Sequence, residues 1–293
     1  MKCKWLLGLL VAAPGFACAT DGDFDSNGVK IHYVTEGEGD AIVLIHGWMS
    51  DSSMWGQDSA GNTKLDTRGA PGFKLIAFDC RGHGKSGKPH DQSMYGAEMA
   101  ADVVRLLNHL KIKKAHLVGY SMGAFIAGKV AATNPERVES LIFGGQAPLI
   151  KGVPASGGNE VEVFAKAVDA GKGLGPYLLE VMPGAKAKMT LEQANNLAAF
   201  AYKGKDVKAF AASGLSLGDL RVAPEDLGKC KAPCLFIYGE KESDATKRSV
   251  DAARKILKNS SLKVVPGGDH ITTLVKPEFG ASVVAFLLAH RAK

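Results

Sequence analysis

Residues 114–135, KAHLVGYSMGAFIAGKVAATNP, join two different patterns at one serine. The first seven residues are apolar enough for a buried strand, and the segment after Ser121 has a helical pattern that ends at Asn134-Pro135. Gly119 and Gly123 flank Ser121 as G-x-S-x-G. A strand that turns sharply into a helix brings two backbones close together, which requires glycines. The pattern therefore predicts a strand–turn–helix unit with Ser121 at the helix N-terminus.

Ser121 at this turn is a candidate nucleophile. The surrounding fold would hold its backbone at a strained angle, and the positive end of the next helix would favour negative charge that develops beside the hydroxyl. The alternative is a tight turn with an incidental serine, because G-x-S-x-G also occurs by chance. A strand before the motif and a helix after it are the context that a nucleophile requires, so the pattern favours catalysis.

Strands and helices alternate along most of the chain. Short apolar runs predict strands at 29–37, 41–47, 73–79, 114–120, 138–145, 233–240 and 261–268. Helical spacing predicts helices at 95–112, 122–135, 243–257 and 277–291. This alternation indicates the α/β class, with a mostly parallel sheet covered by helices on both faces. Only short helical patterns occur at 147–229, so we expect an inserted helical cap there, between core segments 20–146 and 230–293.

A serine nucleophile requires a base, and an acid that orients the base. His270, in PGGDHIT, follows the last predicted strand in a loop, at the edge of the sheet where sites are built. The other histidines lie in strands, helices, loops or the C-terminal tail: His32, His46, His83, His90, His109, His116 and His290. The strand before that of His270 is followed by Glu240, Glu242 and Asp244, which gives the chain order serine, acid, histidine.

The segment GHGKSG, residues 82–87, matches the G-x-G-x-x-G pattern of dinucleotide sites. In those sites the glycines open directly into a helix, whereas here Lys88-Pro89-His90-Asp91 follows, which is typical of a loop. We therefore expect no dinucleotide cofactor. The motif is interpreted as a glycine-rich connection that Asp79 and Arg81 anchor.

Five motifs in this order resemble the α/β-hydrolase superfamily: HGW (46–48), FDCRGHGKSG (78–87), GYSMG (119–123), YGEKESD (238–244) and GGDH (267–270). The resemblance covers about residues 24–290, and the lobe at 147–229 corresponds to the family's cap. The chain is similar to the branch of small bacterial serine esterases, lactonases, perhydrolase-like enzymes and carbon–carbon hydrolases. One position departs from the family's pattern, because Glu242 stands where aspartate is usual; Asp244 is the alternative acid.

The resemblance implies a catalytic triad of Ser121, His270 and Glu242, or Asp244 in place of Glu242. A serine at the elbow implies acyl transfer, because the family's haloalkane dehalogenases and epoxide hydrolases have aspartate there. We expect hydrolysis of a small carboxylic ester or lactone through an acyl-enzyme, with no cofactor and no metal. Carbon–carbon bond hydrolysis, and a catalytically weak protein that binds a small molecule, are the alternatives.

The resemblance also implies an oxyanion hole made of the backbone N–H groups of Met122 and Trp48. Neither role depends on a side chain. The Trp48 indole is expected to line the acyl pocket, with packing in the core as the alternative. Apolar residues of the cap are expected either to roof the pocket or to pack the cap onto the core, with packing favoured: Phe164, Tyr177, Leu178, Met182, Phe200 and Phe210.

The N-terminal segment MKCKWLLGLLVAAPGFACAT is typical of a secretory signal peptide. Lys2 and Lys4 precede an apolar stretch that is too short to span a bilayer, and Ala17-Cys18-Ala19 is a small-x-small cleavage site. We expect cleavage after Ala19 and export. Acylation of Cys18, as in a lipoprotein, fits less well because the leucine usual three places upstream is absent.

The distribution of charge limits the classes of binding partner that we expect. Lysine and arginine number 36 against 30 acidic residues, mixed along the chain, without a basic stripe interleaved with aromatics. We therefore expect a small-molecule substrate, no nucleic acid and no membrane span, with the oligomeric state left open. Cys80, Cys230 and Cys234 follow the signal peptide, and their disulfide state is also open.

Overall fold

The computed structural model describes residues 20–56, 72–155, 158–182 and 184–291. The predicted signal peptide, with Cys18 and Ala19, lies outside these residues. Across the described ranges, no helix is both long and apolar enough to cross a membrane.

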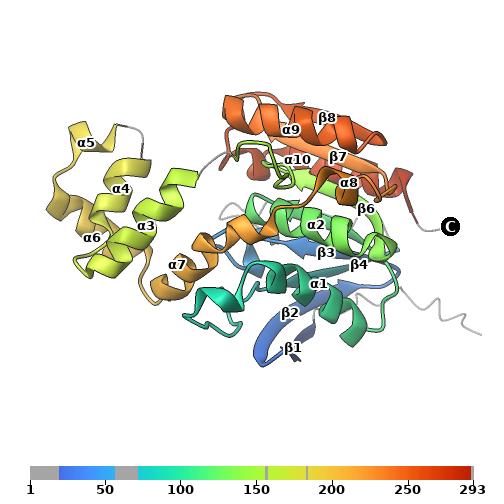
Figure 1. Cartoon of the computed structure of the whole chain (residues 1–293), viewed down its shortest axis with the longest axis horizontal. Coiled ribbons are helices and arrows are strands. Elements are labelled where there is room, and N and C mark those ends of the chain that lie inside the picture. Colours follow the sequence, from blue (N-terminus) through green and yellow to red (C-terminus); the bar gives the residue numbers. More distant parts are fainter. Residues whose placement is uncertain (1–19, 57–71, 156–157, 183, 292–293) are drawn as a thin grey trace, which may run out of the picture.

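Within the described residues, eight strands form one sheet in the order β1-β2-β4-β3-β5-β6-β7-β8 (Figure 1). β2 pairs antiparallel with β1 and with β4, and every other neighbouring pair is parallel. The predicted α/β class with a mostly parallel sheet is confirmed. The strands are β1 (Thr20–Ser26), β2 (Val29–Gly37), β3 (Asp40–Ile45), β4 (Phe73–Phe78), β5 (Ala115–Tyr120), β6 (Val138–Gly144), β7 (Cys234–Gly239) and β8 (Ser260–Val265).

Helices cover both faces of the sheet (Figure 1). Successive residues of β3 point to opposite faces: Val43 belongs to one buried hydrophobic cluster and Ile42 to a second one. Both are fully buried, which explains why this strand is a continuous apolar run. The helices of the core are α1 (Ala97–His109), α2 (Met122–Thr133), α8 (Pro224–Leu227), α9 (Asp244–Ile256) and α10 (Pro277–Ala289). Short 3-10 helices are η1 (Ser52–Trp55), η2 (Gln92–Met94), η3 (Pro135–Arg137), η4 (Leu217–Leu220) and η5 (Thr273–Val275).

The part of the β6–β7 connection that contains α3 to α7 forms the cap, which projects beside the sheet in Figure 1. Its two ends meet in a neck, where Ile150 forms a parallel bridge with Val222. Val222 donates its N–H to Leu149 O at 2.8 Å, and Lys151 donates its own to Val222 O at 2.9 Å. The helices of the cap are α3 (Gly158–Ala170), α4 (Gly175–Val181), α5 (Ala185–Lys188), α6 (Leu191–Ala201) and α7 (Val207–Leu215).

The aromatic and large apolar residues of the cap mostly pack against one another. Phe164, Tyr177, Leu178 and Phe210 lie in one buried cluster. Phe200 remains 80% exposed. Met182 is also exposed. The four buried residues of this set therefore pack within the cap and do not roof the pocket at Ser121.

The order of the strands creates a crevice at the centre of the sheet. The chain passes from β3 to β4 on one side of β3, and β5 lies on the other side. Loops that leave the carboxyl ends of β3 and β5 therefore diverge, and this switch point is where open α/β sheets bind ligands. Ser121 follows β5 directly, and Trp48 follows β3 by three residues.

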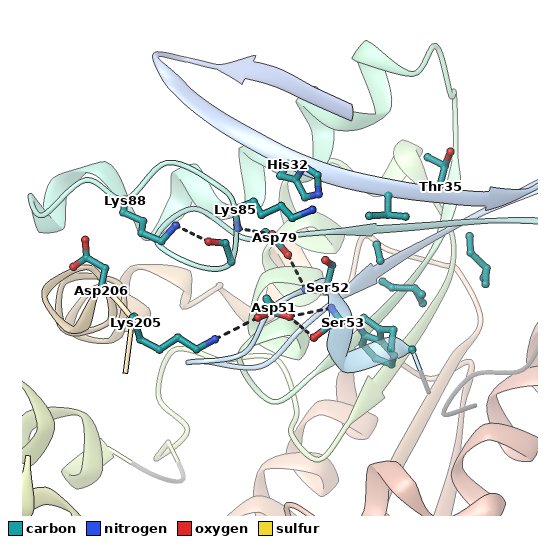
Figure 2. A pocket seen from close by; sticks show the side chains of 18 of the residues that line it. His32, Thr35, Asp51, Ser52, Ser53, Asp79, Lys85, Lys88, Lys205 and Asp206 are labelled. Carbon is teal, nitrogen blue, oxygen red and sulfur yellow. Dashed lines mark hydrogen bonds and ion pairs between the residues drawn. The ribbon is translucent and has the colours of Figure 1, made fainter. Parts of the chain in front are cut away.

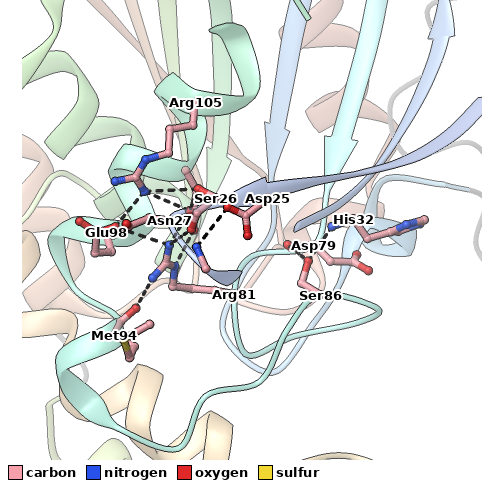
Figure 3. Close-up of polar contacts among 12 residues, drawn as sticks. Asp25, Ser26, Asn27, His32, Asp79, Arg81, Ser86, Met94, Glu98 and Arg105 are labelled. Atoms are coloured by element: carbon pink, nitrogen blue, oxygen red, sulfur yellow. Dashed lines mark hydrogen bonds and ion pairs between the residues drawn. The ribbon is translucent and has the colours of Figure 1, made fainter. Parts of the chain in front are cut away.

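A buried ion pair anchors the loop after β4, and Figure 3 labels its cation, Arg81. Arg81 is fully buried, and its Nε and Nη2 donate to the two carboxylate oxygens of Asp102 at 2.7 and 2.6 Å. Arg81 also donates to Met94 O, and Asp102 accepts from Ser26 Oγ at 2.5 Å. Burial raises the pKa of Asp102 although Arg81 opposes it. The pair thus joins the loop, α1 and β1 through groups that water does not reach.

The glycine-rich segment 82–87 closes as a loop on Asp79. The two carboxylate oxygens of Asp79 accept from Ser52 N and Lys85 N, both at 2.7 Å. A Cβ on Gly84 would lie 2.2 Å from the Asp79 carboxylate, which explains a glycine at that position. The prediction that Asp79 and Arg81 anchor this connection is confirmed.

Candidate active site

Ser121 occupies the turn between β5 and α2 with φ of 54° and ψ of −117°. Residues with a side chain rarely adopt this conformation, so the fold maintains local strain at Ser121. A Cβ on Gly119 would lie 2.1 Å from Gly123 O, and one on Gly123 would lie 2.0 Å from Ile45 O. Both glycines are therefore required by backbone contact, as expected from the motif.

His270 lies between Ser121 and Glu242. Its Nε2 is 3.0 Å from Ser121 Oγ, and its Nδ1 is 2.9 Å from Glu242 Oε2. Because the carboxylate can only accept, Nδ1 carries the proton and Nε2 is left to accept from the serine hydroxyl. The three residues, which come from the ends of β5, β7 and β8, form one hydrogen-bonded chain.

Glu242, and not Asp244, is the carboxylate that reaches the histidine. The Glu242 N–H donates to Gly239 O at 2.9 Å, which turns the chain back beneath His270, and Glu242 is 7% exposed. Ser243 then caps α9 through its side chain, which accepts from Thr246 N. Asp244 is thereby placed in the first turn of α9, on the exposed surface.

Tyr120 and Asp269 hold the loop that carries His270. Tyr120 is buried, and its hydroxyl donates to the backbone oxygen of His270 at 2.7 Å. The Asp269 carboxylate accepts from Ile271 N and Thr272 N at 3.0 and 2.7 Å. Sequence reasoning missed both residues. Aspartate after two glycines is a signal for such a turn, whereas no pattern distinguishes Tyr120 from a core residue.

We expect His270 to set the acid limb of the pH profile. Burial lowers the pKa of His270, but the hydrogen bond to Glu242 and the charges of Glu242, Glu160 and Asp269 outweigh it, so the pKa lies above the ordinary 6.5. A protonated imidazole cannot accept the Ser121 proton, so activity is lost as the pH falls through this raised pKa. The measurement is kcat/KM for a neutral ester against pH, with a lower midpoint above 6.5 expected. A midpoint below 6.5 would mean that burial dominates.

His46 fixes the loop that carries Trp48. The fully buried ring accepts from Cys80 N through Nε2 at 2.9 Å, so the proton is on Nδ1, which donates to Gly47 O at 2.8 Å. Trp48 then reaches the cap, where its indole N–H donates to Phe210 O at 2.9 Å. The Trp48 side chain therefore both packs the cap on the core and lines the cavity described next.

A cavity of about 270 Å³ opens onto Ser121 and His270. The two residues predicted to supply oxyanion N–H groups, Met122 and Trp48, also line it. Its wall combines core and cap, with Phe125, Gln146, Leu149, Ala155, Glu160, Val161, Glu162, Gly214, Leu215, Leu217, Gly218 and Arg221. Glu160, from α3, was not singled out by sequence reasoning, because its position relative to the triad depends on how the cap docks.

A larger cavity, about 790 Å³, lies elsewhere (Figure 2). It is bordered by strand residues such as His32 and Thr35, by η1, and by Lys85, Lys88 and Lys205. Ser121, His270 and Glu242 do not line it. Ser121 and His270 line the smaller cavity instead. In the parts of the chain that the structure describes, no group of three or more His, Cys, Asp or Glu residues could hold a metal ion.

Comparison with known proteins places this geometry in a family. A family model for the alpha/beta hydrolase fold matches residues 40–171, which contain the elbow and the strands around it. Over this segment the chain belongs to the α/β-hydrolase superfamily. A carboxylesterase structure from the thaumarchaeon Nitrososphaera gargenis superposes on this α/β hydrolase with a TM-score of 0.70 at 21% identity, covering 92% of this chain and 98% of the other.

Two curated relatives show the breadth of the family. The α/β hydrolase is 30% identical over 159 residues to a protein of Caballeronia sordidicola named epoxide hydrolase. That match covers 54% of this chain and 44% of the relative, so it spans less than half of the relative's length. A non-heme haloperoxidase of Rhodococcus erythropolis is 28% identical over 286 residues, which cover 89% of this chain and 97% of the relative.

Proposed function

We propose that this α/β hydrolase is an exported serine hydrolase that cleaves a small carboxylic ester or lactone. The observation that carries the proposal is the hydrogen-bonded chain from Ser121 Oγ through His270 to Glu242, which opens onto a cavity of about 270 Å³. A cavity of this size suits a substrate of few carbon atoms. The apolar lining residues Phe125, Leu149 and Leu217 suit an uncharged acyl or alkyl group.

The mechanism follows from the donor and acceptor roles. His270 Nε2 takes the Ser121 proton as Oγ attacks the carbonyl carbon, while Glu242 stabilises the imidazolium through Nδ1. The N–H groups of Met122 and Trp48 donate to the oxyanion of the tetrahedral intermediate. His270 then protonates the leaving alkoxide, which leaves an acyl-enzyme on Ser121. Water, deprotonated by His270, releases the acid and restores the serine.

Ser121 favours acyl transfer over the reaction named for the Caballeronia relative. A serine ester formed from a carbonyl compound is readily hydrolysed, whereas opening of an epoxide by a serine would leave a stable ether. Two other candidates remain with the same residues. Carbon–carbon hydrolysis would use the same triad, and a weak enzyme would use the cavity for binding.

Active-site labelling and a substrate panel test the proposal together. Wild type is expected to react rapidly with a fluorophosphonate probe, because only an activated serine does so, and Ser121→Ala is expected to lose the label. The panel contains p-nitrophenyl acetate and butyrate, a simple lactone and a vinylogous diketone. Turnover of esters or the lactone supports the proposal. Turnover of the diketone alone assigns carbon–carbon hydrolysis, and a wild type that is never labelled would be a binding protein.

Export is a separate part of the proposal. It rests on the sequence of residues 1–19 alone. N-terminal sequencing of the protein recovered from outside the cytoplasm should begin at Thr20.

A further inference from the structure

The wall of the triad cavity carries an acidic side chain without a partner. Glu160, from α3, lines the cavity together with Ser121 and His270. Among the described residues, Glu160 makes no hydrogen bond or ion pair, whereas its neighbour Glu162 lies 3.9 Å from Lys166. Of the two glutamates in this wall, Glu160 is therefore the one that is free for a ligand.

Glu160 and His270 act on each other across the cavity. Burial raises the pKa of Glu160 above its ordinary 4.5, and the charge of His270 lowers it. In the other direction, Glu160 is one of the carboxylates that raise the pKa of His270. No lysine or arginine contributes to the pKa of Glu160. Glu160 therefore shares its cavity with the reacting groups, and in the described part of the chain no lysine or arginine is paired with it.

Arg221 is the arginine of this wall, and its positive charge could favour an anionic ligand. It also lines the cavity, but its Nη1 donates to Ile150 O and Val153 O at 3.3 and 3.1 Å. Arg221 is therefore engaged in the neck of the cap. The rings of Trp48 and Phe125 complete this wall, and aromatic rings attract cations and repel anions at their faces.

We infer that Glu160 makes this cavity select a substrate that carries a positive charge, an alkylammonium group, on the part of the ester that enters it. The inference rests on the proposed function and names its substrate class. Glu160 is exposed to solvent as well as lining the cavity, so its attraction for an ammonium group has the modest size of a surface ion pair. A neutral substrate of the same shape lacks that attraction but leaves no buried group unsatisfied, so it is hydrolysed more slowly and not rejected.

Isosteric ester pairs test the inference. On the acyl side, p-nitrophenyl 4-(trimethylammonio)butyrate is compared with p-nitrophenyl 5,5-dimethylhexanoate. On the alcohol side, butyrylcholine is compared with 3,3-dimethylbutyl butyrate. Within each pair a carbon replaces the charged nitrogen and the shape is kept. Rates within each pair are measured at the same pH and compared as ratios, so that a change in the His270 pKa, which alters both members alike, does not enter the comparison.

Wild type is expected to prefer the cationic member of at least one pair by about fivefold in kcat/KM, and the preference should fall with added salt. Glu160→Gln should remove the preference by slowing the cationic member of the pair more than the neutral one. Glu162→Gln, the matched control two residues away, should keep it. Equal rates within both pairs, or a preference that survives Glu160→Gln, would overturn the inference.

Failure of the proposed function gives a different result. In that case neither member of either pair is hydrolysed. The binding of choline alone to wild type, Glu160→Gln and Glu162→Gln is then measured by calorimetry. Weaker binding of choline by Glu160→Gln than by wild type and Glu162→Gln would still support a cation site. Binding that is absent from wild type, or the same in all three proteins, would overturn it.

Discussion

Ser121→Ala is expected to lower kcat for ester hydrolysis about 10⁶-fold, and Glu242→Gln about 10⁴-fold. Removal of the nucleophile abolishes the covalent route altogether. Glutamine keeps the shape of Glu242 but loses the charge that stabilises the His270 imidazolium, and its amide can favour the wrong tautomer. The measurement is single-turnover and steady-state kinetics on p-nitrophenyl butyrate.

Asp244→Asn is the matched control for the acid. Asp244 lies exposed in the first turn of α9, so its substitution should change kcat less than about twofold. The order of the effects is what matters. If Asp244→Asn were the more damaging of the two carboxylate variants, the assignment of Glu242 as the acid would be wrong.

Arg81→Met is expected to lower the free energy of unfolding by about 3–5 kcal/mol, because it leaves the Asp102 carboxylate buried without its cation. For a chain of this size, the loss corresponds to a decrease in Tm of about 10 °C. Two side-chain nitrogens of Arg81 contact Asp102 at 2.7 and 2.6 Å, and neither residue is more than 1% exposed. Thermal and urea unfolding measure the change.

Two comparisons distinguish a buried pair from charge in general. Lys85→Met breaks an exposed pair with Asp21, 3.3 Å long, and should cost less than about 1 kcal/mol. Arg81→Met combined with Asp102→Leu removes both charges and should recover part of the loss. A loss below about 1 kcal/mol for Arg81→Met alone would show that water reaches Asp102 in solution.

The elbow and the parallel sheet could be predicted because local physics dictates them. Gly119 and Gly123 are required by atoms only a few residues away in sequence or in the adjacent strand, so the motif carries its own structural explanation. Buried parallel strands are apolar throughout, which made β3 and β5 visible as continuous runs. β1 was missed for the opposite reason, because TDGDFDS is an edge strand in which Phe24 and Ser26 alone are buried.

The acid and the wall of the cavity could not be settled in the same way. Glu242 and Asp244 both follow β7 within a few residues. Which of them reaches His270 depends on the turn that Glu242 closes on Gly239 and on the helix cap at Ser243. In the cap, Phe164 and Glu160 lie on one helix, yet Phe164 packs inside the cap and Glu160 lines the cavity. Which side of α3 meets the triad depends on docking between segments far apart in sequence.

The neck at Ile150 and Val222 has a consequence for how such proteins diversify. Both ends of the cap leave the core through adjacent residues joined by two backbone hydrogen bonds. One recombination event can therefore exchange everything between them without shifting the register of any strand of the sheet. Glu160 travels with the exchanged segment, whereas Ser121 and His270 remain behind. With the roles proposed for these residues, bond cleavage and the choice of substrate can thus be inherited separately.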